Sequence, residues 1–215
     1  MHVNLDVTDA ASVDQALRSV ERELDVVDLL VNNAGVAGST ESRSWEDEPS
    51  DWWRVFEVNV LGSFLCSRAV LPSMVERRAG RIVNIASNAA FYRIDVEDVI
   101  DTAYMASKSA LVRLGEALAA ETAAYGISVF TVSPGMVKTD MTAAIFPELW
   151  DDPQVWAEPE LAAELVEFIA SGALDGLSGR YIHAVRDNWR EMPENVTEIL
   201  NRDWHSVRLQ RAEPL

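Results

Sequence analysis

The sequence places a tyrosine and a lysine, Tyr104 and Lys108, four residues apart in a stretch that favours helix. Residues at this spacing share one face of a helix, so the lysine ammonium would lie near the tyrosine phenol. A positive charge favours the phenolate, and we therefore expect the pKa of Tyr104 to fall from about 10 toward neutrality. A phenol with such a pKa can act as a general acid or base.

The Tyr-x-x-x-Lys pattern is a weak signal by itself, since most such pairs are solvated partners on a helix surface. Two further observations favour chemistry here. Lys108 is one of only two lysines in the chain, the other being Lys138. An apolar stretch that ends in Ser87 precedes the pair and would bring a hydroxyl group to the end of a strand.

The elements that must position these residues follow from the hydrophobic pattern. The predicted strands cover residues 3–7, 26–31, 81–87, 127–133 and 179–184. The predicted helices cover residues 9–24, 50–78, 103–125 and 160–171; Pro72 should kink the second helix and Gly80 should end it. Residues 136–158 are expected to be irregular. Strands alternating with helices predict an α/β fold with a parallel sheet, whose ligands bind at the carboxyl ends of the strands.

Composition narrows the class of protein. The 215 residues suit a single domain, 1–215, with 187–215 as a C-terminal extension. The formal net charge of −17 disfavours nucleic acid and anionic membranes as partners. One cysteine and three scattered histidines offer no zinc cluster, so no metal site is expected. No signal peptide or membrane-spanning run is visible, and we expect a cytoplasmic protein.

Taken together, the motifs resemble the classical short-chain dehydrogenase/reductase (SDR) family. The motifs that carry the resemblance are Leu5-Asp6-Val7, Asn32-Asn33-Ala34-Gly35, Asn59, Ser87 at a strand end, Tyr104-x-x-x-Lys108, and Pro134-Gly135 with Thr139. They lie in the family's order and cover roughly residues 3–184. The resemblance implies a Rossmann-like doubly wound parallel sheet, hydride transfer between NAD(P) and a secondary alcohol or ketone, and a homo-dimer or homo-tetramer built on the two long helices.

The resemblance also assigns catalytic roles. Tyr104 corresponds to the acid/base that exchanges a proton with the substrate oxygen. Lys108 would lower the pKa of Tyr104 and bind the nicotinamide ribose. Ser87 would hold the substrate carbonyl or hydroxyl group, and Asn59 would anchor a water molecule in a proton relay.

The remaining matches imply contacts with the cofactor. Asp6 and Val7 resemble the pair that contacts adenine. The other predicted cofactor residues, besides Tyr104 and Lys108, are Asn33, Ala34, Gly35, Pro134, Gly135, Val137 and Thr139. Structural interpretations compete at several positions: Asn32 would brace the sheet, His183 would be a satisfied polar residue, and Trp150 and Trp156 would either wall a substrate pocket or pack within a lid.

The chain departs from the family pattern in two respects. Ser87 and Tyr104 are 17 residues apart, about four more than is usual, which places the extra residues in the acidic loop 91–101. In addition, no three of the ten glycines have the Thr-Gly-x-x-x-Gly-x-Gly spacing that holds the cofactor pyrophosphate. By resemblance, the first two strand–helix units are absent. Residues 3–7 should then either dock beside 26–31 or leave a sheet edge exposed.

Three functions remain open. The first is an NAD(P)-dependent oxidoreductase, impaired in this chain by the missing pyrophosphate loop. The second is a non-catalytic remnant that acts as a binding or partner subunit. The third, a lyase or epimerase of the same broad fold, is disfavoured by the Asn-Asn-Ala-Gly and Pro-Gly motifs. The sequence settles neither the substrate nor the choice between NAD and NADP.

Overall fold

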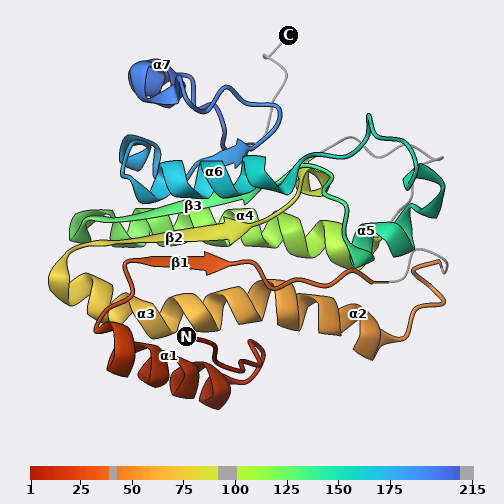
Figure 1. Ribbon diagram of the computed structural model, residues 1–215, viewed down its shortest axis with the longest axis horizontal. Helices are drawn as coiled ribbons and strands as arrows, with labels where there is room; N and C mark the ends of the chain where they lie inside the picture. Colours follow the sequence, from red (N-terminus) through yellow and green to blue (C-terminus); the bar gives the residue numbers. More distant parts are fainter. Residues whose placement is uncertain (39–42, 92–100, 209–215) are drawn as a thin grey trace, which may run out of the picture.

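The computed structural model describes residues 1–38, 43–91 and 101–208 (Figure 1). Within these residues, four strands form one parallel sheet in the order β1-β2-β3-β4. The strands are β1 (Leu29–Asn32), β2 (Gly80–Ile85), β3 (Ile127–Ser133) and β4 (Tyr181–His183). The predicted parallel α/β architecture, a Rossmann-like sheet, is therefore confirmed.

Helices cover both faces of the sheet because neighbouring strand residues point to opposite sides. On one face, Ile82 and Val129 pack against α3 (Ser63–Arg77) and α4 (Thr102–Thr122). On the other face, Val83 and Phe130 pack against α6 (Pro159–Ala170). The strands that carry these pairs are thus buried on both sides, and the sheet becomes a rigid platform for its carboxyl ends.

The remaining elements lie at the rim of this platform. Helix α1 (Ala10–Leu24) packs on α3, and α2 (Pro49–Phe56) continues into α3 through the π-helical segment Glu57–Gly62. The segment predicted as irregular contains the short helix α5 (Asp140–Ile145) and a 3₁₀ turn, Pro147–Leu149. A last short helix, α7 (Val196–Asn201), follows β4.

The strand predicted over residues 3–7 is absent, which corrects that expectation. A strand needs a neighbour to pair its N–H and C=O groups, and among the described residues this segment pairs with no strand of the sheet. Val7 packs instead on Gly62, where an added Cβ would lie 2.7 Å from Val7 Cγ2. Of the two arrangements expected, the exposed sheet edge is the one observed.

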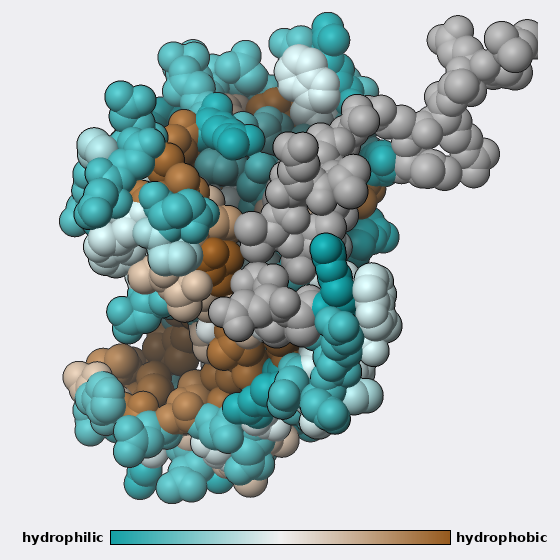
Figure 2. All heavy atoms as spheres, turned by 90° about the vertical axis from the view of Figure 1, so that its right-hand side faces the viewer, coloured by the Kyte–Doolittle hydropathy of each residue, from teal (hydrophilic) through white to brown (hydrophobic). Residues whose placement is uncertain are grey.

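This open edge leaves apolar surface uncovered. Figure 2 faces the carboxyl ends of the strands and shows apolar side chains in a hollow below α6, next to β1. Val31 of β1 is 37% exposed, although it lies in a strand of the central sheet. Exposed apolar residues on an edge strand favour association with other chains, so we expect this edge to promote aggregation of the isolated protein.

Two details of α3 also differ from expectation. The helix continues through Pro72, which is exposed and lies within its last turns. It ends at Arg77 because Arg78 adopts the left-handed conformation, with φ of 55°. Gly80 is the first residue of β2, and it must be glycine because a Cβ there would lie 2.4 Å from Met74 Sδ.

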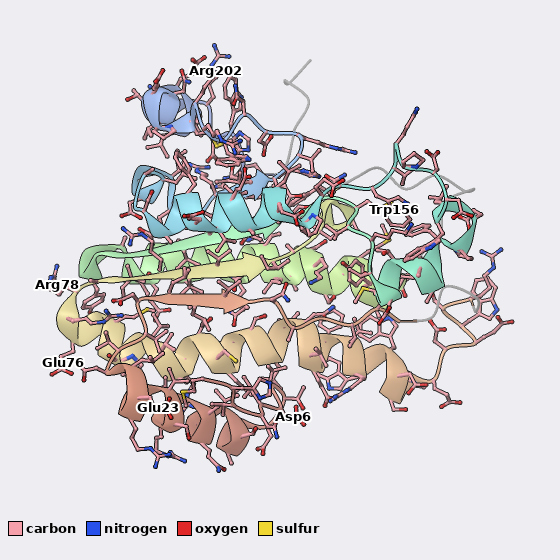
Figure 3. All side chains as sticks on the ribbon, viewed as in Figure 1. Asp6, Glu23, Glu76, Arg78, Trp156 and Arg202 are labelled. Carbon is pink, nitrogen blue, oxygen red and sulfur yellow. The ribbon has the colours of Figure 1, made fainter. Side chains whose placement is uncertain are left out.

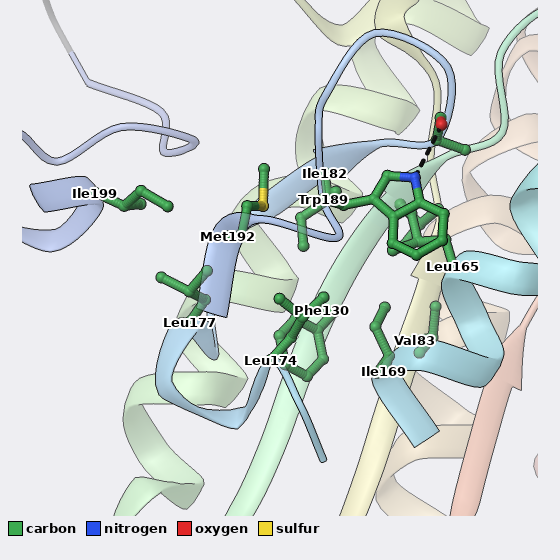
Figure 4. Packing of buried hydrophobic residues seen from close by; sticks show 12 residues of the cluster. Val83, Phe130, Leu165, Ile169, Leu174, Leu177, Ile182, Trp189, Met192 and Ile199 are labelled. Carbon is green, nitrogen blue, oxygen red and sulfur yellow. Dashed lines mark hydrogen bonds between the residues drawn. The ribbon is translucent and has the colours of Figure 1, made fainter. Parts of the chain in front are cut away.

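The segment predicted as a C-terminal extension belongs to the main core. Trp189, Met192 and Ile199 are at most 6% exposed and pack with Phe130 and Leu165 (Figure 4). The Trp189 indole also donates a 3.0 Å hydrogen bond to the main-chain oxygen of Ala184. Residues 189–199 therefore help to close the α6 face of the sheet, whereas Val207 packs against Leu111 and Val112 of α4.

The continuous helix Pro49–Arg77 has 29 residues and is long and apolar enough to cross a membrane by length and composition alone. This corrects the expectation that no such segment exists. The helix packs against α1, α4 and β1, however, and 44% of its most apolar window is buried inside the protein. Core helices commonly meet the same criterion, so it is weak evidence for a membrane.

Candidate active site

The tyrosine singled out by its spacing lies in the first turn of α4, facing the end of β2. Ser87 follows that strand, and its hydroxyl lies close enough to the Tyr104 phenol to lower the pKa of that phenol. The Ser87 Oγ also accepts a 3.1 Å hydrogen bond from the N–H of Ala89, which fixes the hydroxyl in place. The structure therefore brings together the two residues that are separated by 17 positions in the sequence.

The pKa of Tyr104 moves in the direction opposite to that expected. Burial raises the pKa of the phenol, the nearby Ser87 hydroxyl lowers it, and the negative charge of Asp101 raises it again. The expected fall toward neutrality is wrong for this chain, because burial of the phenol is the largest effect on its pKa. Tyr104 is therefore a protonated phenol at neutral pH.

Lys108 is a buried cation beneath the tyrosine. It is 4% exposed, and its Nζ donates a 2.9 Å hydrogen bond to the main-chain oxygen of Ile85, at the end of β2. The same Nζ lies 5.5 Å from the centre of the Tyr104 ring. Burial lowers the pKa of Lys108 to about 8. An ammonium with that pKa readily exchanges a proton near neutral pH.

Asn59 lies in the π-helical segment between α2 and α3 and is fully buried. Its Oδ1 accepts a 2.9 Å hydrogen bond from the N–H of Val36, and its Nδ2 donates to the Val36 oxygen and to Ser107 Oγ. The side chain thus ties the loop after β1 to α4. Its predicted role as the anchor of a water molecule remains a prediction.

Ser107 is a site residue that the sequence reasoning missed. It is completely buried, accepts the 2.9 Å bond from Asn59, and donates a 2.8 Å bond to the main-chain oxygen of Tyr104. A serine within Tyr-x-x-x-Lys carries no distinct signal, since only the fold shows that it faces Asn59.

The loop after β1 supplies the next predicted group. Gly35 lies beside both Asn59 and Lys108, because an added Cβ would sit 3.4 Å from Asn59 Oδ1 and 3.4 Å from Lys108 Nζ. Asn33 and Ala34 are exposed just before it. The backbone of Gly35 therefore lies next to Asn59 and Lys108, on the side of the loop after β1.

The loop after β3 forms another part of the same edge. Gly135 has φ of +88°, and an added Cβ would lie 2.7 Å from Val185 Cγ2, so both its conformation and its surroundings require glycine. Pro134 precedes it, half-buried. Val137 forms a parallel bridge with Ala157, which closes the segment between them into a loop. Thr139 caps α5 in a reciprocal capping box with Thr142.

Asp6 and Val7 lie elsewhere. Asp6 is exposed, and its Oδ1 accepts hydrogen bonds of 2.9 and 2.7 Å from the N–H and hydroxyl of Thr8. Figure 3 shows Asp6 beside the first turn of α1, on the side of α3 away from the sheet. Their predicted contact with adenine remains a prediction, and this placement does not support it.

The competing structural interpretations can be judged at several positions. Asn32 braces the sheet, as expected, because its Nδ2 donates to the Ser63 oxygen, Ser67 Oγ and Asn84 Oδ1. His183 is a satisfied polar residue, since its Nδ1 accepts from the N–H of Val185 and its pKa is lowered by burial.

Trp150 and Trp156 pack on each other, with ring centres 5.8 Å apart. This contact supports packing within a lid. The Trp156 indole also donates a 3.0 Å hydrogen bond to the main-chain oxygen of Leu149. The extra loop residues predicted within 91–101 lie almost wholly outside the described residues.

The residues present would fit one half of a dinucleotide cofactor. Gly35 lies beside the Lys108 ammonium, which is 5.5 Å from the centre of the Tyr104 ring, and this group would hold the nicotinamide ribose. For the pyrophosphate half, the sequence contains no glycine-rich turn leading into a helix, and the described residues include no such turn at the end of a strand. The described site would thus hold the reacting end of the cofactor and not its phosphates.

The parallel sheet and its cluster of serine, tyrosine and lysine define a class of protein. The sequence matches the short chain dehydrogenase family over residues 1–150. The chain belongs to this family of oxidoreductases, and the family predicted from the motifs is confirmed.

Particular relatives support the same assignment. Short chain dehydrogenase pigC of Monascus ruber is 34% identical over 205 residues, covering 94% of this chain and 65% of the relative. Inactive 2-(S)-hydroxypropyl-CoM dehydrogenase 2 of Xanthobacter autotrophicus is 43% identical over 162 residues, covering 75% of this chain and 65% of the relative. The chain therefore spans about two thirds of the length of these relatives.

Among solved structures, a gluconate 5-dehydrogenase from Burkholderia cenocepacia in complex with NADP and tartrate is similar with a TM-score of 0.74. It is 28% identical, and the match covers 85% of this chain and 72% of that one. A similarity at this level supports the same sheet and helix arrangement around the candidate site.

Proposed function

We propose that the protein is an NAD(P)-dependent oxidoreductase that interconverts a secondary alcohol and a ketone. The observation that carries this proposal is the cluster in which the Tyr104 phenol meets the Ser87 hydroxyl with the Lys108 ammonium 5.5 Å from its ring. A hydroxyl, a phenol and a buried cation around one point can hold a carbonyl oxygen and protonate it. NAD(P)H, when bound, supplies the hydride.

The proton chemistry favours reduction of the ketone. Because burial and Asp101 raise the pKa of Tyr104, the phenol carries its proton at neutral pH and can donate it to a carbonyl oxygen. Ser87 would hold that oxygen by a hydrogen bond. Lys108, whose pKa is about 8, would hold the ribose and can return a proton to the tyrosine.

The test is a turnover assay in which loss of NADH or NADPH absorbance is followed with a panel of ketones. Replacing Tyr104 by phenylalanine removes the proton donor and should lower kcat by about 1000-fold. Tyr125→Phe is the matched control, because Tyr125 is 41% exposed at the end of α4, and its activity should be unchanged. A Tyr104→Phe variant as active as the Tyr125→Phe variant and the parent would refute the role given to Tyr104.

We also propose that cofactor affinity is impaired in the 215-residue chain. The sequence offers no glycine-rich turn for the pyrophosphate, so the cofactor would be held at its nicotinamide end alone. Titration with NADH and with NADPH, followed by nucleotide fluorescence, should give dissociation constants in the millimolar range or weaker. Micromolar binding of either nucleotide would contradict this proposal. The same titration would decide between NAD and NADP.

A second candidate is a non-catalytic subunit that binds a partner. What favours it is the 43% identity to a relative whose name describes it as inactive, together with the missing pyrophosphate turn. Against it stands the intact set of Ser87, Tyr104 and Lys108. Turnover by the parent chain with any ketone would exclude this second candidate.

The oligomeric state is also a proposal. A groove of about 440 Å³ runs between α3 and α4 and is lined mainly by apolar side chains, including Phe64, Leu71 and Leu118. Phe64 is 41% exposed there, as is Leu61 one turn away. We expect these two helices to form the interface of a homo-dimer or homo-tetramer. The cytoplasmic location remains a prediction.

A further inference from the structure

The connection between Ser87 and Tyr104 ends at a buried carboxylate. Asp101 is 7% exposed and is the N-cap residue of α4, the helix that carries Tyr104 and Lys108. Its Oδ1 accepts a 2.9 Å hydrogen bond from the N–H of Tyr104. A cap of this kind satisfies one of the free N–H groups at a helix start, and serine or asparagine would serve equally well.

The second carboxylate oxygen makes a contact that a simple cap does not need. Asp101 Oδ2 accepts a 2.6 Å hydrogen bond from the N–H of Gly38, in the loop that follows β1. The approach is close, since a Cβ added at Gly38 would lie 2.9 Å from Asp101 Oδ1. One buried carboxylate therefore joins the N–H of the proposed proton donor to a loop 63 positions away along the chain.

Other contacts hold the same turn from the outside. The indole of Trp52, on α2, donates a 3.1 Å hydrogen bond to Thr102 Oγ1. Ser107 and Asn59 hold the following turn, through the Tyr104 oxygen and the Val36 backbone. Of these contacts, the carboxylate of Asp101 is the one that brings a negative charge to the first turn of α4.

We propose that Asp101 is a positioning residue, which fixes the turn bearing Tyr104 against the loop after β1 and places its negative charge beside the phenol. This proposal deepens the proposed function and rests on it for its catalytic consequence. The bond to Gly38 joins the start of α4 to a loop that is distant along the chain, so it holds the turn bearing Tyr104 independently of the connection from Ser87.

The charge of Asp101 has a measurable consequence at the phenol. Among the described residues, the groups that face Tyr104 are Ser87 from the end of β2, Asp101 and Lys108 from α4, and Tyr181 from β4. Burial raises the pKa of Tyr181 to about 12, so that phenol is neutral near pH 7. Asp101 is thus the negative charge of this set, and it helps to keep Tyr104 protonated.

The test uses tyrosine labelled with ¹³C at Cζ and observed by NMR, with the Tyr104 signal assigned through the Tyr104→Phe variant. In Asp101→Asn the negative charge is lost. The side-chain NH₂ group of the asparagine must also replace one of the two carboxylate oxygens, so it faces the backbone N–H of Gly38 or Tyr104 and cannot accept a hydrogen bond from it. The pKa of Tyr104 should therefore fall below that of the parent chain, and the amide of Gly38 should exchange at least about tenfold faster. An unchanged or higher pKa would overturn the proposal.

Two further variants complete the design. Asp9→Asn makes the same chemical change at the exposed N-cap of α1, so it should leave the pKa of Tyr104 unchanged. Asp101→Ser keeps a capping group but is too short to reach Gly38. It should fold with α4 intact, lower the pKa of Tyr104, and reduce kcat by about tenfold or more. A parent chain without turnover would count against the proposed function alone, since the NMR titration still decides the role of Asp101.

Discussion

Lys108 on helix α4 donates a 2.9 Å hydrogen bond to the main-chain oxygen of Ile85, the last residue of strand β2. This bond joins the helix to the end of the sheet. The Lys108 Nζ lies 5.5 Å from the centre of the Tyr104 ring. The buried cation is thus held by a neutral acceptor, and burial lowers its pKa to about 8.

A buried lysine of this kind should reduce stability. The unfolded chain binds a proton at Lys108 up to a pKa of 10.5, whereas the folded chain releases it near 8, so folding is penalised below pH 8. The difference corresponds to about 3 kcal/mol, and losing the bond to Ile85 offsets about 1 kcal/mol of that. Lys108→Met should therefore raise the free energy of unfolding by about 2 kcal/mol at pH 7.

The same gain should shrink as the pH rises. Between pH 8 and 10.5 the parent chain becomes more stable as its folded lysine loses the proton ahead of the unfolded one, while the methionine variant does not change. Urea unfolding at pH 7 and at pH 10 measures both effects. The exposed Lys138, replaced by methionine, is the control and should not raise the free energy of unfolding. A less stable Lys108→Met variant at pH 7 would contradict this expectation.

Replacing Asn59 should lower stability. Asn59→Ala removes three hydrogen bonds and leaves the backbone groups of Val36 and the hydroxyl of Ser107 without these buried partners. We expect the free energy of unfolding to fall by about 3 kcal/mol in urea denaturation. The exposed Asn4→Ala variant should stay within about 0.5 kcal/mol of the parent. A loss below 1 kcal/mol at Asn59 would show that the loop after β1 does not depend on it.

The parts of the fold that the sequence predicts well are those whose evidence is local. The strand predicted over 127–133 is observed at those residues, because all seven are buried and a continuous apolar run leaves little choice of register. The prediction over 3–7 is wrong because a strand depends on its neighbours. The alternation of Val3, Leu5 and Val7 indicates an amphipathic segment. It does not indicate whether a neighbouring strand is available to pair with that segment.

The site, too, could be predicted only where the evidence was local. The order of the motifs along the chain pointed to Ser87, Tyr104 and Lys108, and the structure brings these residues together. The direction of the Tyr104 pKa shift could not be predicted from spacing, because it depends on burial of the phenol and on the charge of Asp101. Asp101 was visible only as one acid of a loop, and its contact with Gly38 spans 63 positions of sequence.

Trp189 should be essential to the fold. It is 3% exposed within the main core, so Trp189→Ala removes a large buried side chain and should cost about 3–5 kcal/mol. Thermal unfolding followed by circular dichroism measures the loss. Trp45→Ala, at a position 81% exposed, should leave the melting temperature almost unchanged. Equal stability of the two variants would mean that residues 187–208 are an appendage after all.

The groove between α3 and α4 should decide the oligomeric state. Phe64 is 41% exposed on it, so Phe64→Arg should leave the monomer folded but place a charge in the centre of the proposed interface. A buried unpaired charge of this kind costs several kcal/mol, so the variant should sediment as a monomer where the parent sediments as a dimer or tetramer. Trp45→Arg adds the same charge in the loop before α2 and should leave the assembly intact. A monomeric parent, or an oligomeric Phe64→Arg variant, would place the interface elsewhere or remove it.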